Sequence, residues 1–188
     1  MCFYVQGFQL SNYVDDGLLI YNDEKLPKEL LMHLKKNFEI KECKIDKFLG
    51  FQMKILNSGT LFLHQYQYTE KVLNRFNMRD CNSVSTPLEP GWINNDANEK
   101  SKENYPYIEL IGSLIYLSII SRPDISFAVG VLSRFMENPS QTHINAAKRI
   151  LRYLKGTMDY GLLYSKKEDF ILNTYSDSDY GGDVENRR

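Results

Sequence analysis

The sequence predicts an α+β protein in which strands and a helix come first, a helical region follows, and further strands begin near the C-terminal end. Residues 2–21 and 48–65 are short runs of aromatic and aliphatic residues between turn residues, which is typical of strands. Residues 106–156 instead repeat apolar residues at helical spacing. The intervening stretch 82–102 is rich in Ser, Asn, Pro, Gly and charges and predicts a linker, in which Trp92 is the one residue able to anchor it to a surface.

The composition excludes several classes of protein. The 188 residues carry 23 Lys+Arg against 24 Asp+Glu, so no overall field attracts a polyanion, and a nucleic acid would have to meet a local patch. Cys2, Cys43 and Cys81 are widely spaced and match no zinc pattern, so we expect reduced thiols. The N-terminus lacks the features of a signal peptide, and the apolar stretch 110–120 is too short to span a membrane. We therefore expect an intracellular protein, cytoplasmic or nuclear rather than secreted, with no membrane partner.

An acidic pair, Asp15-Asp16, lies between two apolar runs at 8–11 and 18–21. We expect these runs to be the arms of a hairpin with its turn at Asp16-Gly17, because Gly accepts a positive φ without steric cost and Asp tolerates it. Two carboxylates at a rigid tip, with no base nearby, suit a hard divalent cation, so one hypothesis is a Mg²⁺ site. The simpler alternative is an ordinary hairpin with a polar tip.

A helix is expected over about 24–38. Asn22 and Asp23 are good capping residues, and Pro27 suits a first helical turn. The apolar side of this helix is formed by Leu30, Leu31, Leu34 and Phe38.

A second hairpin is expected from arms at 48–55 and 60–65, joined by an Asn-Ser-Gly turn. Gly50 falls inside the first arm, where a glycine marks a bulge or the close approach of another backbone, including that of a ligand. Thr69 is expected to cap a helix that runs to about Asn77.

Three helices are expected in the helical region. The first spans about 106–121, the second runs from Pro123 to a stop at Asn138-Pro139, and the third runs from a cap at Ser140 or Thr142 to Gly156.

The third of these helices carries a basic stripe. Lys148, Arg152 and Lys155 fall at i, i+4 and i+7, Arg149 is adjacent, and no acid lies between 141 and 157. This is the local patch able to bind phosphates despite the neutral total, although such faces also serve only for solvation.

Two strands, 160–164 and 170–175, are expected to pair near the C-terminal end. Asp177 follows the second strand into a Gly-rich turn and is a second candidate metal ligand.

Eight short motifs, taken in order, resemble those of the copia-type retrotransposon Pol polyprotein, and the resemblance covers nearly the whole chain. They are Tyr13-Val14-Asp15-Asp16, Phe48-Leu49-Gly50, Ser85-Thr86-Pro87-Leu88, residues 110–117, Arg122-Pro123-Asp124-Ile125, residues 132–136, residues 147–157 and Ser176-Asp177-Ser178-Asp179.

The resemblance implies a fragment of a reverse transcriptase, an RNA-directed DNA polymerase, in four parts. Residues 1–81 would be a partial palm with a metal-site hairpin, a primer-grip-like hairpin and a first thumb-like helix. A linker at 82–102 would lead to a helical thumb and connection at 103–158, and 159–188 would begin a ribonuclease H-like domain that is truncated here.

The same resemblance implies roles for single residues. Asp15 and Asp16 would hold two Mg²⁺ ions for nucleotidyl transfer, and Asp177 would be the first metal-binding carboxylate of ribonuclease H. The nucleic-acid contacts would come from Phe48, Leu49, Gly50, Lys148, Arg149, Arg152 and Lys155. The partners would be an RNA/DNA template-primer duplex, dNTPs and the remainder of the Pol polyprotein, in the cytoplasm within a virus-like particle or in the nucleus.

The chain also departs from the family pattern, because the upstream palm strand with a third catalytic Asp and the later ribonuclease H acids are not among its residues. We therefore expect the chain alone not to polymerise DNA. Two alternatives stay open. One is a non-catalytic nucleic-acid-binding remnant that acts through its basic stripe, and the other is a relic of a decayed element with no function of its own.

Overall fold

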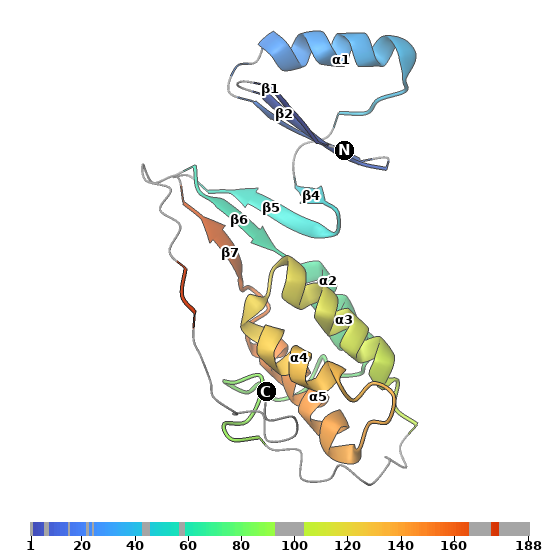
Figure 1. Ribbon diagram of the computed structural model, residues 1–188, viewed down its shortest axis with the longest axis vertical. Coiled ribbons are helices and arrows are strands. Elements are labelled where there is room, and N and C mark those ends of the chain that lie inside the picture. Colours follow the sequence, from blue (N-terminus) through green and yellow to red (C-terminus); the bar gives the residue numbers. More distant parts are fainter. Residues whose placement is uncertain are drawn as a thin grey trace.

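The computed structural model describes residues 2–5, 8–14, 16–21, 23, 25–42, 46–56, 59–92, 104–165 and 174–176. Within these ranges, helices accompany two antiparallel sheets, so the predicted α+β class is confirmed (Figure 1). None of the helices in the described ranges combines the length and the apolar character needed to cross a membrane.

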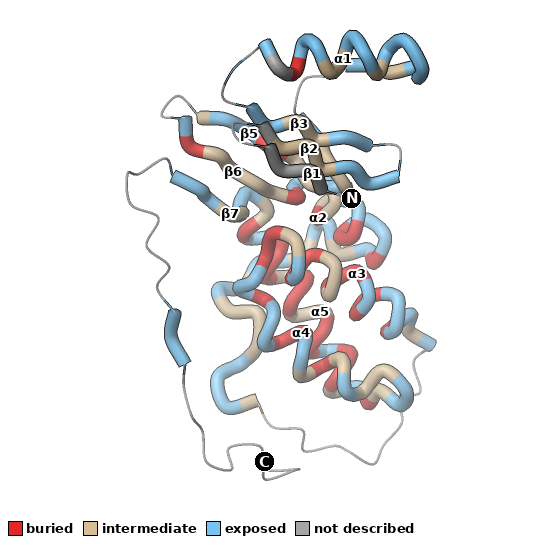
Figure 2. Tube along the Cα trace, turned by 45° about the horizontal axis from the view of Figure 1, so that its top comes forward, coloured by how far each residue is buried: buried red, intermediate tan, exposed pale blue. Residues whose placement is uncertain are grey.

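The first sheet has the strand order β1-β2-β3, formed by Cys2–Val5, Phe8–Tyr13 and Asp16–Tyr21. It is followed by α1 (Lys25–Asn37), which confirms the helix predicted over 24–38. Asp23 caps α1, because its Oδ1 accepts a hydrogen bond from the Lys25 amide at 3.0 Å. Most of the described side chains of this sheet and of α1 are exposed or half-buried (Figure 2).

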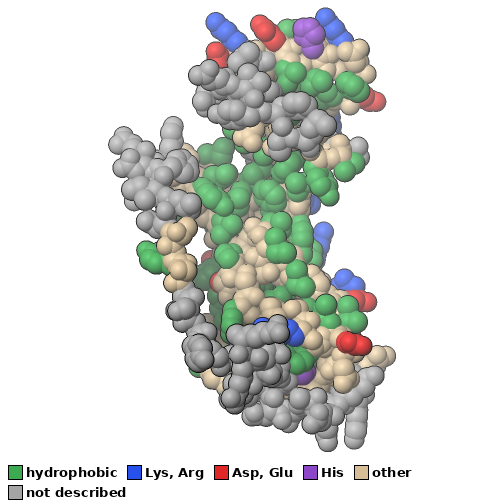
Figure 3. Space-filling model, viewed as in Figure 1, with side chains coloured by type: hydrophobic (Ala, Val, Ile, Leu, Met, Phe, Trp, Pro, Cys, Tyr) green, Lys and Arg blue, Asp and Glu red, His purple; other side chains and the backbone are tan. Residues whose placement is uncertain are grey.

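The second sheet has the order β4-β5-β6-β7, formed by Lys47–Phe48, Phe51–Ile55, Leu61–His64 and Gly161–Tyr164. Hydrophobic side chains gather over this sheet and the neighbouring helices (Figure 3).

The strand β7 joins this sheet by pairing with β6, a pairing that the sequence did not predict. We expected residues 160–164 to pair with a strand at 170–175, but 170–173 lie outside the described residues and 174–175 belong to no strand. The pairing partners Gly161 and His64 are far apart in the sequence, so no local turn signal announces their pairing. Gly161 also lies so close to the β6 backbone that an added Cβ would overlap the carbonyl oxygen of Leu63.

The remaining helices form a bundle: α2 (Tyr66–Arg75), α3 (Tyr107–Ile120), α4 (Ser126–Ser133), which follows a 3₁₀ turn at Pro123–Ile125, and α5 (Gln141–Gly156). The predicted positions of α3 and α5 are confirmed, whereas α4 ends well before the expected stop at Asn138. Phe135 follows α4 and stacks on His143 of α5, with ring centroids 3.9 Å apart. Ser140 is the cap of α5, because its Oγ accepts from the His143 amide and the His143 Nδ1 accepts from the Ser140 amide.

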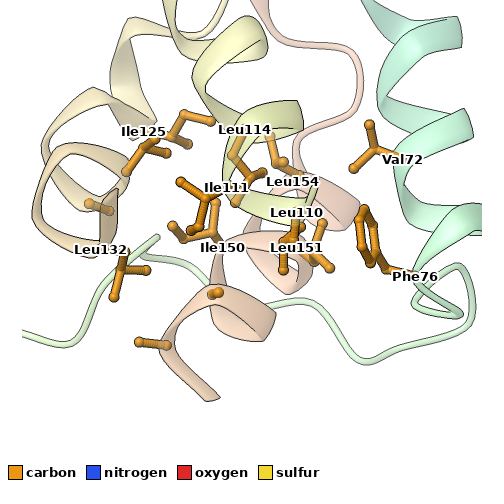
Figure 4. Close-up of a cluster of buried hydrophobic side chains, with 14 of the residues drawn as sticks. Val72, Phe76, Leu110, Ile111, Leu114, Ile125, Leu132, Ile150, Leu151 and Leu154 are labelled. Atoms are coloured by element: carbon orange, nitrogen blue, oxygen red, sulfur yellow. The ribbon is translucent and has the colours of Figure 1, made fainter. Parts of the chain in front are cut away.

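One hydrophobic core lies between these helices (Figures 2 and 4). The fully buried aliphatic side chains are Leu73, Leu110, Ile111, Leu114, Leu117, Ile125, Leu132, Ile144, Ile150, Leu151 and Leu154. Burying one such side chain contributes about 1.5–3 kcal/mol, so the bundle is the most strongly stabilised part that the structure describes.

The start of α2 differs from the prediction. The helix begins at Tyr66, and Thr69 is buried inside it, with its amide bonded to the carbonyl of Gln65 at 2.8 Å. The alternation of Gln and Tyr before Thr69 resembles the end of a strand. In the structure, however, the Tyr68 ring packs edge-on against the Tyr116 ring of α3, with ring centroids 4.9 Å apart. This tertiary contact places the first turn in the bundle.

Residues 82–92, here called the strap, form no helix or strand, yet they pack along α5 instead of crossing free solvent. Leu88 and Trp92 pack against the bundle core, as the anchoring role predicted for Trp92 requires. Ser83 lies against Gly156 so closely that an added Cβ would come within 2.9 Å of it.

Candidate functional site

The β2–β3 hairpin carries the predicted acidic pair at its tip. Tyr13 pairs directly with Asp16, so the chain turns between these two residues, and Gly17 lies within β3, paired with Asn12. The predicted hairpin is confirmed, but its turn precedes the Asp16-Gly17 pair at which the sequence predicts it. Val14 adopts a φ of 51°, a conformation that β-branched residues rarely take, so local preference points away from the real turn.

Of the three predicted metal ligands, Asp16 is described and exposed, whereas Asp15 and Asp177 lie outside the described residues. The part of the chain that the structure describes contains no group of three or more His, Cys, Asp or Glu side chains arranged to hold a metal ion. The Mg²⁺ sites at the hairpin tip and at Asp177 stay predictions.

The motif Phe48-Leu49-Gly50 forms a second tight turn. Phe48 pairs with Phe51, and the two residues between them both have positive φ, 47° at Leu49 and 86° at Gly50, as in a type I′ turn. The single strand predicted over 48–55 is thus divided into β4 and β5, and Gly50 is a turn residue rather than a bulge. A leucine at positive φ is uncommon, which is why this stretch looks like an uninterrupted strand.

The close approach expected at Gly50 is made by a side chain of the same protein. The hydroxyl of Tyr116 in α3 occupies the space that a Cβ at Gly50 would take, and it donates a hydrogen bond to the Leu49 carbonyl at 2.9 Å. Burial, and to a smaller extent the neighbouring Tyr68, raise the pKa of Tyr116, and the nearby Gln65 side chain offsets part of this. The phenol therefore keeps its proton and remains a donor.

The basic stripe of α5 is largely engaged by the strap. The guanidinium of Arg149 donates to Glu89 Oε1 at 2.8 Å and to Thr86 Oγ1 at 3.1 Å. The Nε of Arg152 donates to the Asn82 carbonyl at 2.8 Å. A cavity of about 520 Å³ remains between the strap and α5.

The other two cations of the stripe differ from each other. The Nζ of Lys148 lies over the ring of Tyr105, 4.6 Å from its centroid, whereas Lys155 has no hydrogen bond or ion pair within the described ranges. Three of the four side chains proposed to bind phosphate thus already contact the chain itself. Phosphate binding by the whole stripe stays a prediction, and it would require the strap to give up contacts.

The exposed side chains of α3 are mostly apolar, apart from Glu109, which forms an ion pair with Arg75 of α2. Ile108, Gly112 and Ile119 recur on the outer face of this helix and are all exposed, Ile119 by 75% of its surface. A Cβ added at Gly112 would meet no atom within 4 Å. Figure 1 shows the β2–β3 tip, the β4–β5 turn and α3 one after another along the right-hand side of the molecule.

A buried arginine, Arg122 of the motif Arg122-Pro123-Asp124-Ile125, ties the end of α5 to the start of α4, a role that the sequence did not predict. Arg122, 2% exposed, donates from Nε and Nη2 to Asp124 at 3.0 and 2.8 Å, and from Nη1 to the Thr157 carbonyl at 2.9 Å. Tyr153 donates its hydroxyl to Asp124 at 2.8 Å. Burial would raise the pKa of Asp124, but the hydrogen bonds and the charge of Arg122, together with Tyr153, hold that pKa below its ordinary value. The signal available was an arginine two residues before an acid at a helix start.

Comparison with known proteins first defines a class. Residues 3–90, which include both tight turns, match the family model described as reverse transcriptase (RNA-dependent DNA polymerase). No solved structure matches the chain.

Three relatives extend the likeness to the rest of the chain. The Pol polyprotein from transposon TNT 1-94 of Nicotiana tabacum is 39% identical over all of this chain and 15% of its own length. The Pol polyprotein from transposon RE2 of Arabidopsis thaliana is 39% identical over 92% of this chain and 12% of its own length. An uncharacterized mitochondrial protein of Arabidopsis thaliana is 36% identical over 94% of this chain and 73% of its own length. The chain belongs to the reverse transcriptase region of the copia-type retrotransposon Pol polyproteins, and it spans about an eighth of the length of these transposon relatives.

Proposed function

We propose that this chain is the palm-to-thumb part of a retrotransposon RNA-directed DNA polymerase, which binds a template-primer duplex inside the cell as part of a Pol polyprotein. In this assignment the first sheet and the β4–β5 hairpin belong to the palm, and α2 to α5 form the thumb and connection. The beginning of a ribonuclease H-like domain near Asp177 remains part of the proposal.

The observation that carries the proposal is the succession of three elements along one side of the molecule (Figure 1). The Leu49-Gly50 turn presents backbone, the outer face of α3 presents Ile108, Gly112 and Ile119, and the β2–β3 tip presents the exposed Asp16. Backbone and apolar side chains let a duplex approach closely, whereas carboxylates at the tip suit Mg²⁺ rather than phosphates. We assign this side, rather than the strap-covered side of α5, to the duplex.

At the hairpin tip, Asp15 and Asp16 would hold Mg²⁺, which supplies charge neutralisation and orientation for nucleotidyl transfer when bound. The turn holds the tip tightly, since Tyr13 and Asp16 pair across it. A positive φ at Val14 is the kind of backbone strain that functional sites retain.

A pair of glycine substitutions tests the proposed duplex face. Gly112 on α3 and Gly130 on α4 are both exposed helical glycines, and a Cβ at either would meet no atom within 4 Å. Gly112→Glu places a negative charge on the proposed face, so its affinity for an RNA–DNA hybrid, measured by fluorescence anisotropy, should fall by about tenfold or more. Gly130→Glu is the matched control and should change the affinity less than about twofold.

Both substitutions replace a glycine in a helix and should leave the fold intact or stabilise it by up to about 1 kcal/mol. If neither variant binds the hybrid more weakly than the wild type does, α3 is not part of the duplex face. Equal losses would show a general charge effect and would also contradict the assignment.

A further inference from the structure

The Leu49-Gly50 turn adopts a conformation that its own sequence does not favour. Two-residue turns with positive φ at both positions prefer Asn-Gly, because a leucine Cβ crowds the backbone at positive φ. The strand before the turn, β4, has two residues, so the ladder that closes the turn is short. A contact from outside the hairpin must hold Leu49 in place.

Tyr116 of α3 supplies that contact. Its hydroxyl donates to the Leu49 carbonyl at 2.9 Å and fills the space beside Gly50. The Tyr116 ring is held in turn by Tyr68 of α2, which packs edge-on against it with ring centroids 4.9 Å apart.

A second link fixes the same corner of the bundle. Gln65, which precedes α2 and is buried, accepts a hydrogen bond from the Ser121 hydroxyl at the end of α3 at 2.9 Å. This hydrogen bond joins α2, which carries Tyr68, to α3, which carries Tyr116. The position of the Tyr116 phenol is therefore restricted.

We infer that Tyr116 is a positioning residue for duplex binding: it holds the Leu49-Gly50 turn in its left-handed conformation and ties this turn to α3. The inference rests on the proposed function, in which the turn and the outer face of α3 meet the same duplex. Since Tyr116 and that outer face share one helix, a single hydrogen bond sets the spacing of the two contact surfaces.

The test uses the full chain and the substitution Tyr116→Phe, which removes the hydroxyl and keeps the ring. Loss of one hydrogen bond should speed amide hydrogen exchange over residues 47–52 by about five- to tenfold, while exchange in α4 and α5 stays unchanged. Affinity for an RNA–DNA hybrid of about 20 base pairs should fall by about three- to tenfold. Tyr68→Phe is the control, because among the described residues the Tyr68 hydroxyl makes no hydrogen bond to the turn.

A rescue separates positioning from general support of the bundle. Leu49→Asn creates Asn-Gly, which favours this turn by itself, so the double variant Leu49→Asn with Tyr116→Phe should recover slow exchange over 47–52. A defect of the bundle core would not respond to a change at the turn, and absence of rescue would therefore count against the inference.

The outcomes distinguish the two proposals. If the wild-type chain binds the hybrid and Tyr116→Phe leaves either the exchange or the affinity unchanged, the positioning role fails alone. If the wild-type chain does not bind the hybrid, the proposed function fails and the positioning role fails with it.

Discussion

Replacing Arg122 with Met should destabilise the fold strongly, because it breaks a buried network of hydrogen bonds. The guanidinium is 2% exposed and makes hydrogen bonds to Asp124 and Thr157, and its Cζ lies 5.6 Å from the ring centroids of Tyr153 and Tyr160. Removing one partner of a buried ion pair costs about 3–5 kcal/mol. The Asp124 side chain is 32% exposed and can regain water, so we expect the lower end, about 3 kcal/mol.

The loss can be measured by urea and thermal unfolding followed by circular dichroism. A loss of 3 kcal/mol in a chain of this size should lower the Tm by about 6–12 °C. The control is Arg79→Met, which breaks the exposed ion pair with Glu70 at 2.9 Å and should cost less than about 1 kcal/mol. If Arg122→Met costs no more than this control, the reasoning about the buried network is wrong.

Three further predictions concern pH, packing and metal. The pKa of Asp124 is lower in the folded protein than its ordinary value of 3.8. The ionised Asp124 therefore contributes its full stabilisation above pH 3.8, and this stabilisation is lost as the pH falls through the folded pKa. In an acid titration, the free energy of unfolding of Asp124→Asn should thus decrease less below about pH 4 than that of the wild type. Gly161→Ala should separate β7 from β6, since its Cβ overlaps the Leu63 carbonyl, and should cost about 2 kcal/mol or more in urea unfolding. The full chain should not extend a primer with Mg²⁺; extension that disappears in Asp15→Asn would contradict our expectation that the chain alone is inactive and would place the metal at the hairpin tip.

Helical periodicity was the most informative signal in the sequence. It located α1, α3 and α5 because each helix repeats its apolar residues over several turns and carries clear signals at its ends. Asp23 before α1 and Ser140 before α5 both act as the caps that their types suggest.

One of the two tight turns was misplaced and the other was not predicted, for a common physical reason. Val14 and Leu49 have positive φ, although neither residue type favours it, so the turn signals of the sequence pointed to Asp16-Gly17 and to an unbroken strand. At Leu49 the compensation comes from Tyr116, 67 residues further along the chain. A contact at such a distance leaves no trace in local spacing.

The contacts of the strap with the arginines of α5 and the pairing of β7 were missed because both depend on tertiary structure. Nothing in the composition of 82–92 indicates that Glu89 and the Asn82 carbonyl would engage the arginines of α5. The family motifs identified the acidic pair and the second turn as candidate site residues, but they did not single out the contacts that hold the second turn in place.

The pairing of β6 with β7 makes the helical bundle an excursion from a sheet. The chain leaves the sheet after His64 and returns at Gly161, and these two residues are direct partners. Entry and exit of the bundle therefore lie side by side, and the two ends of the excursion are joined by ladder hydrogen bonds. A lengthening of the chain inside the bundle, for example between the strap and α3, leaves this junction unchanged, so such insertions should be tolerated without altering how the bundle is attached to the sheet.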